Sequence, residues 1–214
     1  RFERGDNDGA ISDLDKTIEF AAKVPMVYYN RGLAKQAREK HAEAILDFTK
    51  SIEIDPKFVD GYYARGLAYQ TLGKSAEALA DYDKCLGLRS QFFEGLYNRA
   101  TLRLAADNLD GAISDYTQAL SINPRDHDCY FYRARARERK GELELAAGDY
   151  GKVIELNPQS AEAYAGRGIV RLSLKKDAEA QADFDQCLKL NPTMKESLNR
   201  RIEYARYQRD KKKR

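Results

Sequence analysis

Few residues in this chain have the types and spacing that catalysis, metal binding or phosphate binding requires. The Gly73–Ser75 segment has the ending of a phosphate-binding loop, but that motif's first glycine would fall at Ala68, inside an expected helix with no preceding strand. His127 and Cys129 carry the atoms for metal binding or nucleophilic attack, yet the only other histidine is His41. We therefore expect no metal, no cofactor and no catalytic residue.

Paired acidic residues are the remaining candidates for general acid–base chemistry. Asp81 and Asp83 recur as Asp183 and Asp185, so the pair belongs to a repeating pattern. Residues two apart on a helix point to different faces, and such carboxylates cannot act together on one substrate. The sequence therefore predicts a protein that is not an enzyme.

Residues 34 positions apart carry the same residue types along the whole chain. One slot holds an arginine followed by glycine or alanine, a second slot an alanine, and a third an aromatic residue. These slots are Arg31-Gly32, Arg65-Gly66, Arg99-Ala100, Arg133-Ala134 and Arg167-Gly168; Ala44, Ala78, Ala112, Ala146 and Ala180; and Phe48, Tyr82, Tyr116, Tyr150 and Phe184. A fixed period of this length indicates a stacked repeat array.

This pattern resembles the tetratricopeptide repeat. The family's leading aromatic position is filled by Tyr28, Tyr62, Tyr130 and Tyr164, with Leu96 in one unit, and an arginine replaces the usual leucine. The resemblance covers roughly residues 1–194 without an insertion. It implies an all-α protein, a right-handed superhelical solenoid of antiparallel helix pairs.

The period divides the chain into one predicted solenoid over residues 1–214. A partial repeat at 1–24 would precede five full repeats at 25–58, 59–92, 93–126, 127–160 and 161–194. A capping helix at 195–209 would use Leu198, Ile202, Tyr204 and Ala205 as its apolar face, and a basic tail would follow at 210–214. Because the first repeat lacks its first half, we expect further sequence upstream of Arg1.

Each repeat also predicts its own internal contacts. Small residues after the arginine allow two helices to approach closely, and the aromatic residue fills the space beside them. An aspartate follows each arginine by 16 residues, which predicts a structural ion pair across helices rather than an arginine ladder for anions. These pairs are Arg31 and Asp47, Arg65 and Asp81, Arg99 and Asp115, Arg133 and Asp149, and Arg167 and Asp183.

Charge and cysteine content restrict the environment. The net charge is +3, but residues 200–214 carry +6, so the preceding array is mildly acidic. Cys85, Cys129 and Cys187 are odd in number and far apart, which predicts core packing and favours a reducing compartment. No apolar run reaches 18 residues, so we expect no membrane span and a cytoplasmic location, although an upstream targeting segment would change the latter.

The resemblance implies that the first helix of each repeat lines a concave groove. Helical spacing then predicts an aromatic stripe with asparagines beside it, and an acidic rim at Asp60, Glu94, Asp128 and Glu162. The predicted groove residues are Tyr29, Asn30, Leu33, Tyr63, Leu67, Tyr97, Asn98, Thr101, Phe131, Tyr132 and Arg135. Two interpretations of the tyrosines stay open: a surface that contacts a peptide, or rings that pack between repeats.

The leading function is a non-catalytic scaffold that binds an extended peptide or partner segment in this groove. The family's carboxylate-clamp residues are replaced here by Tyr29, Leu33, Ala64, Glu94 and Asn98, which disfavours binding of chaperone tails. One alternative is self-association through the incomplete N-terminal repeat. Single-stranded RNA, stacked on aromatics beside Arg135, Arg137 and Arg139, is a weaker alternative because the array is net negative.

Overall fold

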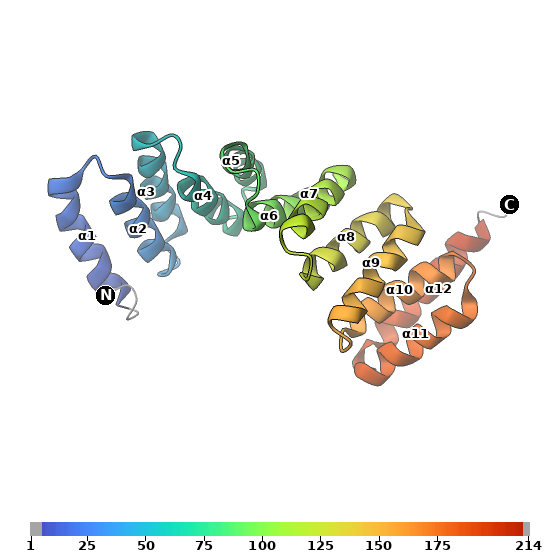
Figure 1. Cartoon of the computed structure of the whole chain (residues 1–214). Helices are drawn as coiled ribbons and strands as arrows, with labels where there is room; N and C mark the ends of the chain where they lie inside the picture. The colour runs from blue at the N-terminus through green and yellow to red at the C-terminus, as the bar shows by residue number, and fades with distance from the viewer. Residues whose placement is uncertain (1–5, 212–214) are drawn as a thin grey trace. The chain divides into compact units, whose positions relative to one another are not determined.

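The computed structural model describes residues 6–211, which form α-helices joined by short turns and, within that range, no β-strand (Figure 1). The helices are α1 (Asn7–Ala21), α2 (Pro25–Gln36), α3 (His41–Ile54), α4 (Val59–Thr71), α5 (Ser75–Leu88), α6 (Phe93–Ala105), α7 (Leu109–Ile122), α8 (His127–Lys140), α9 (Leu143–Leu156), α10 (Ala161–Ser173), α11 (Asp177–Leu190) and α12 (Lys195–Lys211). The expected all-α solenoid of helix pairs with a C-terminal helix is confirmed.

The chain forms two compact units whose boundary lies within α6. Unit 1 extends to Leu102 and unit 2 begins at Arg103. In unit 1, each of α1 to α4 packs against the next helix in the chain. In unit 2, α7 packs on α8, α8 on α9 and α9 on α10, while α10 contacts both α11 and α12.

The turn from the first to the second helix of each repeat contains one residue in the left-handed region of backbone space. Two of these residues are the glycines Gly73 and Gly141. The other three are Glu39, Asp107 and Lys175, at φ of 59°, 61° and 63°. Since a side chain is disfavoured in this conformation, three of the five turns hold a residue less suited to it than glycine.

Close helix approach leaves no room for a Cβ at the glycines of the predicted slot, whereas two repeats carry the buried residues Ala100 and Ala134 there. A Cβ added to Gly32 would lie 2.5 Å from a ring carbon of Phe48, and one added to Gly168 would lie 2.4 Å from a ring carbon of Phe184. Real Cβ atoms do not come so close to other carbons, so an aromatic ring covers the glycine where a side chain would have been. The aromatic slot is fully or almost fully buried in Phe48, Tyr82, Tyr116, Tyr150 and Phe184.

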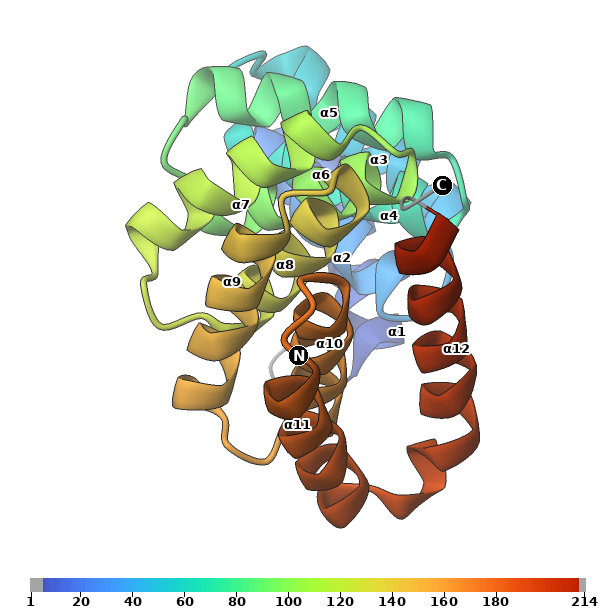
Figure 2. The ribbon, with the colours of Figure 1, turned by 90° about the vertical axis from the view of Figure 1, so that its right-hand side faces the viewer.

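The C-terminal helix covers the last hydrophobic face of unit 2. The chain leaves α11 through a short 3-10 turn, Pro192–Met194, and enters α12 (Figure 2). Leu198 and Ala205 are buried against residues of α10 and α11, and Ile202 packs beside them. Tyr204 is 66% exposed, so its assignment to this apolar face was wrong. The ends of the predicted array, residues 1–5 and the tail residues 212–214, lie outside the described residues.

Candidate functional site

The structure brings together four of the arginine–aspartate pairs with nearly identical geometry. In Arg65 and Asp81, Nε donates to Oδ2 at 2.8 Å and Nη2 donates to Oδ1 at 2.7 Å. The same two-point contact joins Arg31 to Asp47, Arg133 to Asp149 and Arg167 to Asp183. The carboxylates are almost fully buried, and parallel N–H donors are the arrangement that stabilises such a charge most strongly. The fifth pair, Arg99 and Asp115, is divided between the two units.

The same arginines also connect neighbouring repeats. Nη1 of Arg31 donates to Asp15 at 2.7 Å, and Nη1 of Arg65 donates to the Thr49 hydroxyl at 3.0 Å. The guanidinium of Arg65 additionally lies over the ring of Tyr62, 5.8 Å from its centroid. Arg31, Arg65 and Arg133 therefore each contact their own repeat, the previous repeat and the leading tyrosine, which explains why arginine stands near tyrosine in these repeats.

A second cation reaches the same aspartates, and the sequence analysis missed it. Lys35 contacts Asp47 at 2.8 Å, Arg137 contacts Asp149 at 2.7 Å, and Arg171 contacts Asp183 at 2.7 Å. Arg103 likewise contacts Asp115 at 2.8 Å. The signal was available, because a lysine or arginine stands 12 residues before the aspartate in four repeats, with Tyr69 as the exception.

These ion pairs show which arginines of α8 are engaged by a buried aspartate and which can still contact a ligand. Arg133 and Arg137 both donate to Asp149, so neither guanidinium is free to hold a ligand. Arg135 is exposed and makes no ion pair or side-chain hydrogen bond within residues 6–211. Of the arginines considered for RNA contact, Arg137 is thus engaged by Asp149, whereas Arg135 is not.

The predicted aromatic stripe is half-buried. The ring of Tyr29 packs edge-on against Phe58, with centroids 5.2 Å apart, and tilted against Phe48 at 5.9 Å. Tyr63 contacts Phe92 at 4.9 Å in the same edge-on manner. Burial raises the pKa of both tyrosine hydroxyls. One side of each ring thus belongs to the packing of its unit, while the other side remains accessible to solvent.

The slots beside the stripe differ in how accessible they are. Asn30 is exposed, whereas the Asn98 amide donates to the Tyr63 hydroxyl at 3.1 Å. Leu33, Leu67 and Thr101 are half-buried. Tyr97 stacks on Phe93 within α6 at a centroid distance of 6.3 Å. In unit 1, Asn30 is therefore the more available of the two asparagines for a peptide backbone.

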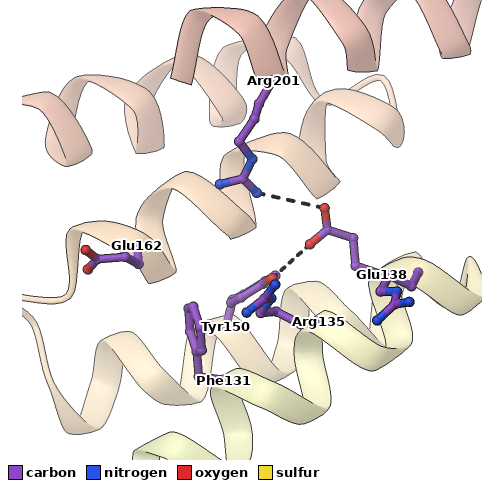
Figure 3. Close-up of a pocket in the computed structure, with 7 residues that line it drawn as sticks. Phe131, Arg135, Glu138, Tyr150, Glu162 and Arg201 are labelled. Carbon is purple, nitrogen blue, oxygen red and sulfur yellow. Dashed lines mark hydrogen bonds and ion pairs between the residues drawn. The ribbon is translucent and has the colours of Figure 1, made fainter. Parts of the chain in front are cut away.

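Unit 2 contains a pocket of about 450 Å³ between α8, α9, α10 and α12. The lining residues are Phe131, Arg135, Glu138 and Arg139 of α8, Tyr150 of α9, Glu162 of α10 and Arg201 of α12. Figure 3 shows Arg201 and Glu138 facing each other, with Phe131, Tyr150 and Arg135 together on one side. We call this cavity the central pocket.

Hydrogen bonds fix part of the central pocket and leave part of it free. The buried Tyr150 hydroxyl donates to Glu138 at 2.8 Å, and burial together with this carboxylate raises the pKa of Tyr150 well above its ordinary value. Arg201 lies 4.0 Å from the other Glu138 oxygen, a long contact that holds the guanidinium weakly. Arg139 is held at the edge by the Leu104 carbonyl and Asp107, at 2.8 and 2.7 Å.

Two smaller cavities continue the central pocket in both directions along α8. One of about 190 Å³ includes His127, Asp128 and Tyr132, and shares Phe131 and Glu162 with the central pocket. The other, of about 380 Å³, includes Arg200, Tyr204 and Gln208 of α12, and shares Glu138 and Arg201. The three cavities follow one another along α8 and share lining residues, and we call them together the α8 trough. Sequence reasoning assigned α12 only to capping and missed its contribution here.

The other chemical candidates are engaged in packing. Cys85, Cys129 and Cys187 are free thiols that are fully buried, and burial raises the pKa of Cys85 to about 11, far from the thiolate form that reacts. Asp81 accepts from Arg65, and Asp83 accepts from Arg99 at 2.6 Å. Within residues 6–211 no group of three histidine, cysteine or acidic side chains is placed to hold a metal ion.

Comparison with known proteins assigns the chain to a class of helical-repeat interaction proteins. The tetratricopeptide-repeat family matches residues 25–58, 48–80, 97–154 and 133–195. The chain belongs to the tetratricopeptide-repeat family, as the sequence pattern predicted. No curated protein sequence matches it.

Solved structures share the fold at low sequence identity. YrrB, described as a TPR protein with an unusual peptide-binding site, is 19% identical, with a TM-score of 0.81 over 91% of this chain and 97% of that one. MamA from Desulfovibrio magneticus RS-1 is 20% identical, with a TM-score of 0.73 over 79% of this chain and 96% of its own.

Membership in this family supports a protein-interaction scaffold in general terms, since these repeats bind protein partners and are generally non-catalytic. None of the helices within residues 6–211 has the length and apolar character needed to cross a bilayer.

Proposed function

We propose that this chain is a non-catalytic scaffold that binds an extended segment of a partner protein on the face formed by its first helices. The observation that carries the proposal is the α8 trough, because three cavities with shared walls lie over α8, α10 and α12. The stripe residues Tyr29 and Tyr63 would contribute the accessible sides of their rings in unit 1. A solved relative in fold, YrrB, is itself described as having a peptide-binding site.

Trough and stripe have the properties of a recognition surface. Half-buried aromatic rings are already fixed by packing, so contact with a ligand costs little side-chain entropy. Asn30, which is exposed, has an amide that can pair with both the N–H and the C=O of an extended backbone. Accessible arginine and glutamate side chains beside the rings would add charge selectivity.

The experiment is a screen of the full chain against a displayed library of random peptides. Glu162→Trp places a large side chain at a wall shared by two of the cavities. Ala182→Trp, on an exposed position of α11 away from the trough, is the matched control. We expect enriched peptides to bind the wild type and the control but not Glu162→Trp, with thermal melts unchanged. Failure to enrich any peptide, or equal binding by Glu162→Trp, would contradict the proposal.

Self-association is a second candidate, favoured by apolar residues at the N-terminal end of unit 1. Phe20 is 89% exposed, and Val24 and Met26 are each more than 40% exposed. A second copy covering them would bury apolar surface. Light scattering at increasing concentration tests this: we expect the mass to rise for the wild type and not for Phe20→Ser, and a constant monomer mass would exclude it.

A further inference from the structure

We propose that the α8 trough selects a partner segment by its order of charges, with a basic residue at one end, an apolar residue in the middle and an acidic residue at the other end. This inference rests on the proposed function and adds the chemistry and the placement of the ligand. It comes from three features of unit 2: an acidic end, an aromatic centre and a basic end along one helix.

The acidic end lies at the start of α8 and α10. Asp128 and Glu162 both line the cavity of about 190 Å³, where the imidazole of His127 lies 3.2 Å from Asp128. Glu162 is exposed and has no ion-pair partner within residues 6–211. Acidic residues in a first turn also stabilise the helix itself, but here two of them from different helices face one cavity. A lysine or arginine of a partner would be held between them.

The centre of the trough is Phe131. Its ring packs against Tyr150 at a centroid distance of 5.8 Å and against Tyr132 at 5.5 Å, both nearly edge-on. The ring is half-buried and borders two of the cavities, so its remaining side faces the trough. An apolar side chain of the ligand would be buried against the Phe131 ring. A charged side chain there would lose its hydration without gaining a group of opposite charge.

The basic end lies over the second half of α8. Among residues 6–211, Arg135 is exposed and has no ion-pair partner, and Arg201 has only the 4.0 Å contact to Glu138, which already accepts a hydrogen bond from Tyr150. By contrast, Arg133 and Arg137 of the same helix are both committed to Asp149. Accessible guanidinium groups from two helices are suited to a carboxylate, because their planar donors match its two oxygens.

Helix geometry sets the length of the ligand. From His127 to Arg139 the trough follows twelve residues of α8, or about 18 Å at a rise of 1.5 Å per residue. An extended chain of about five to six residues covers that distance. Asp128 and Arg135 are seven residues apart, about 10 Å along the helix. The basic and acidic residues of the ligand are therefore expected about three to four positions apart, with the apolar residue between them.

The test is selection of displayed nine-residue peptides built from Lys, Glu, Leu, Tyr, Ser and Gly on the full-length chain. Arg135→Glu and Glu162→Lys reverse the two ends separately, and Arg125→Glu, at an exposed loop position outside the trough, is the matched control. We expect wild type and control to enrich the basic–apolar–acidic order. Arg135→Glu should bind the winning peptide about tenfold more weakly and recover when the peptide's glutamate is changed to lysine.

Each outcome separates this inference from the function on which it rests. Peptides that need the trough, as shown by loss in Glu162→Trp, but carry no charge order would overturn the inference and leave the scaffold function intact. An unchanged preference in both reversal variants would do the same. If no peptide is enriched, or if Arg135→Glu abolishes binding of a poly-uridine strand instead, both the inference and the peptide function are wrong.

Discussion

Phe48→Tyr is expected to stabilise unit 1, because it supplies a hydrogen-bond donor that the neighbouring repeats already have. The Tyr82 hydroxyl donates to Gln70 Oε1 at 2.8 Å, and the Tyr150 hydroxyl donates to Glu138 at the same distance. In the repeat of Phe48, the corresponding acceptor is Gln36 Oε1, which is buried and has no hydrogen-bond partner in the described part of the chain.

The ring positions show that a hydroxyl has the same surroundings available. A Cβ placed on Gly32 would be 3.1 Å from Cζ of Phe48, and one placed on Gly66 would be 3.3 Å from Cζ of Tyr82. The two rings therefore cover their glycines in nearly the same way. A buried hydrogen bond contributes about 0.5–1.5 kcal/mol, and satisfying a buried acceptor recovers a further part of a desolvation cost of about 1–3 kcal/mol. We expect the free energy of unfolding to rise by about 1–2 kcal/mol.

Urea unfolding followed by circular dichroism measures this change, with each variant compared at the same helical signal. In a thermal melt of a chain of this length, each kcal/mol gained in the free energy of unfolding is expected to raise the Tm by about 2–4 °C. Tyr82→Phe is the converse change and should cost about 1–3 kcal/mol, because it leaves Gln70 Oε1 without its donor.

A double-mutant cycle assigns the gain to the proposed hydrogen bond. Gln36→Met removes the acceptor while keeping the side-chain length, so Phe48→Tyr should add nothing in that background. The reasoning is refuted if Phe48→Tyr gives the same gain with Gln36→Met, or if Phe48→Tyr destabilises unit 1 while Tyr82→Phe has no effect.

Four further substitutions, at Gly151, Lys175 and Tyr150, test the stability of unit 2. Gly151→Ala should raise the free energy of unfolding, measured by urea titration, by about 1 kcal/mol because alanine has the higher helix propensity. Gly151→Asp should raise it more than Gly151→Ala at low salt but not at high salt, because a Cβ at this position lies 3.9 Å from Nη1 of Arg167. Lys175→Gly should raise the free energy of unfolding by about 1 kcal/mol, because glycine adopts the left-handed backbone conformation of this position without strain. An unchanged Tm relative to the wild type would contradict this. Burial and the Glu138 carboxylate raise the pKa of Tyr150 in the folded state, so its contribution to stability is fully present below the unfolded pKa of about 10. The free energy of unfolding should therefore fall as the pH rises above about 10, less steeply in Tyr150→Phe.

The fold was predictable because the repeat carries the same information several times. Four helices end at Ile54, Ile122, Leu156 and Leu190, each two residues before a proline, which disfavours a helical conformation in the residue that precedes it. The close contact between Gly32 and Phe48 followed from a small residue and an aromatic at fixed slots. Each such contact lies within one helix pair, so the two residues that form it recur together in the repeats of the sequence.

The parts that escaped prediction depend on geometry that one helix does not contain. Arg137 and Asp149 are 12 residues apart across a turn, and only the recurrence of this spacing in four repeats, not the periodicity of either helix, could have indicated their contact. Whether the stripe was core or surface could not be decided, because a ring such as Tyr63 packs on one side and is accessible on the other. The central pocket needs Arg201 from α12, which stands outside the repeat.

Alternation along α8 explains how one helix can serve both stability and recognition. Arg133 and Arg137 are four residues apart and share the face that contacts Asp149, while Arg135 and Arg139, also four apart, line the trough. A change at position 135 therefore alters the charge of the trough without removing a partner from the buried carboxylate. Replacement of Arg133 would instead leave Asp149 with one fewer donor, which destabilises the helix pair whatever ligand is bound. In this array, positions two residues apart on a first helix are expected to separate binding phenotypes from folding phenotypes.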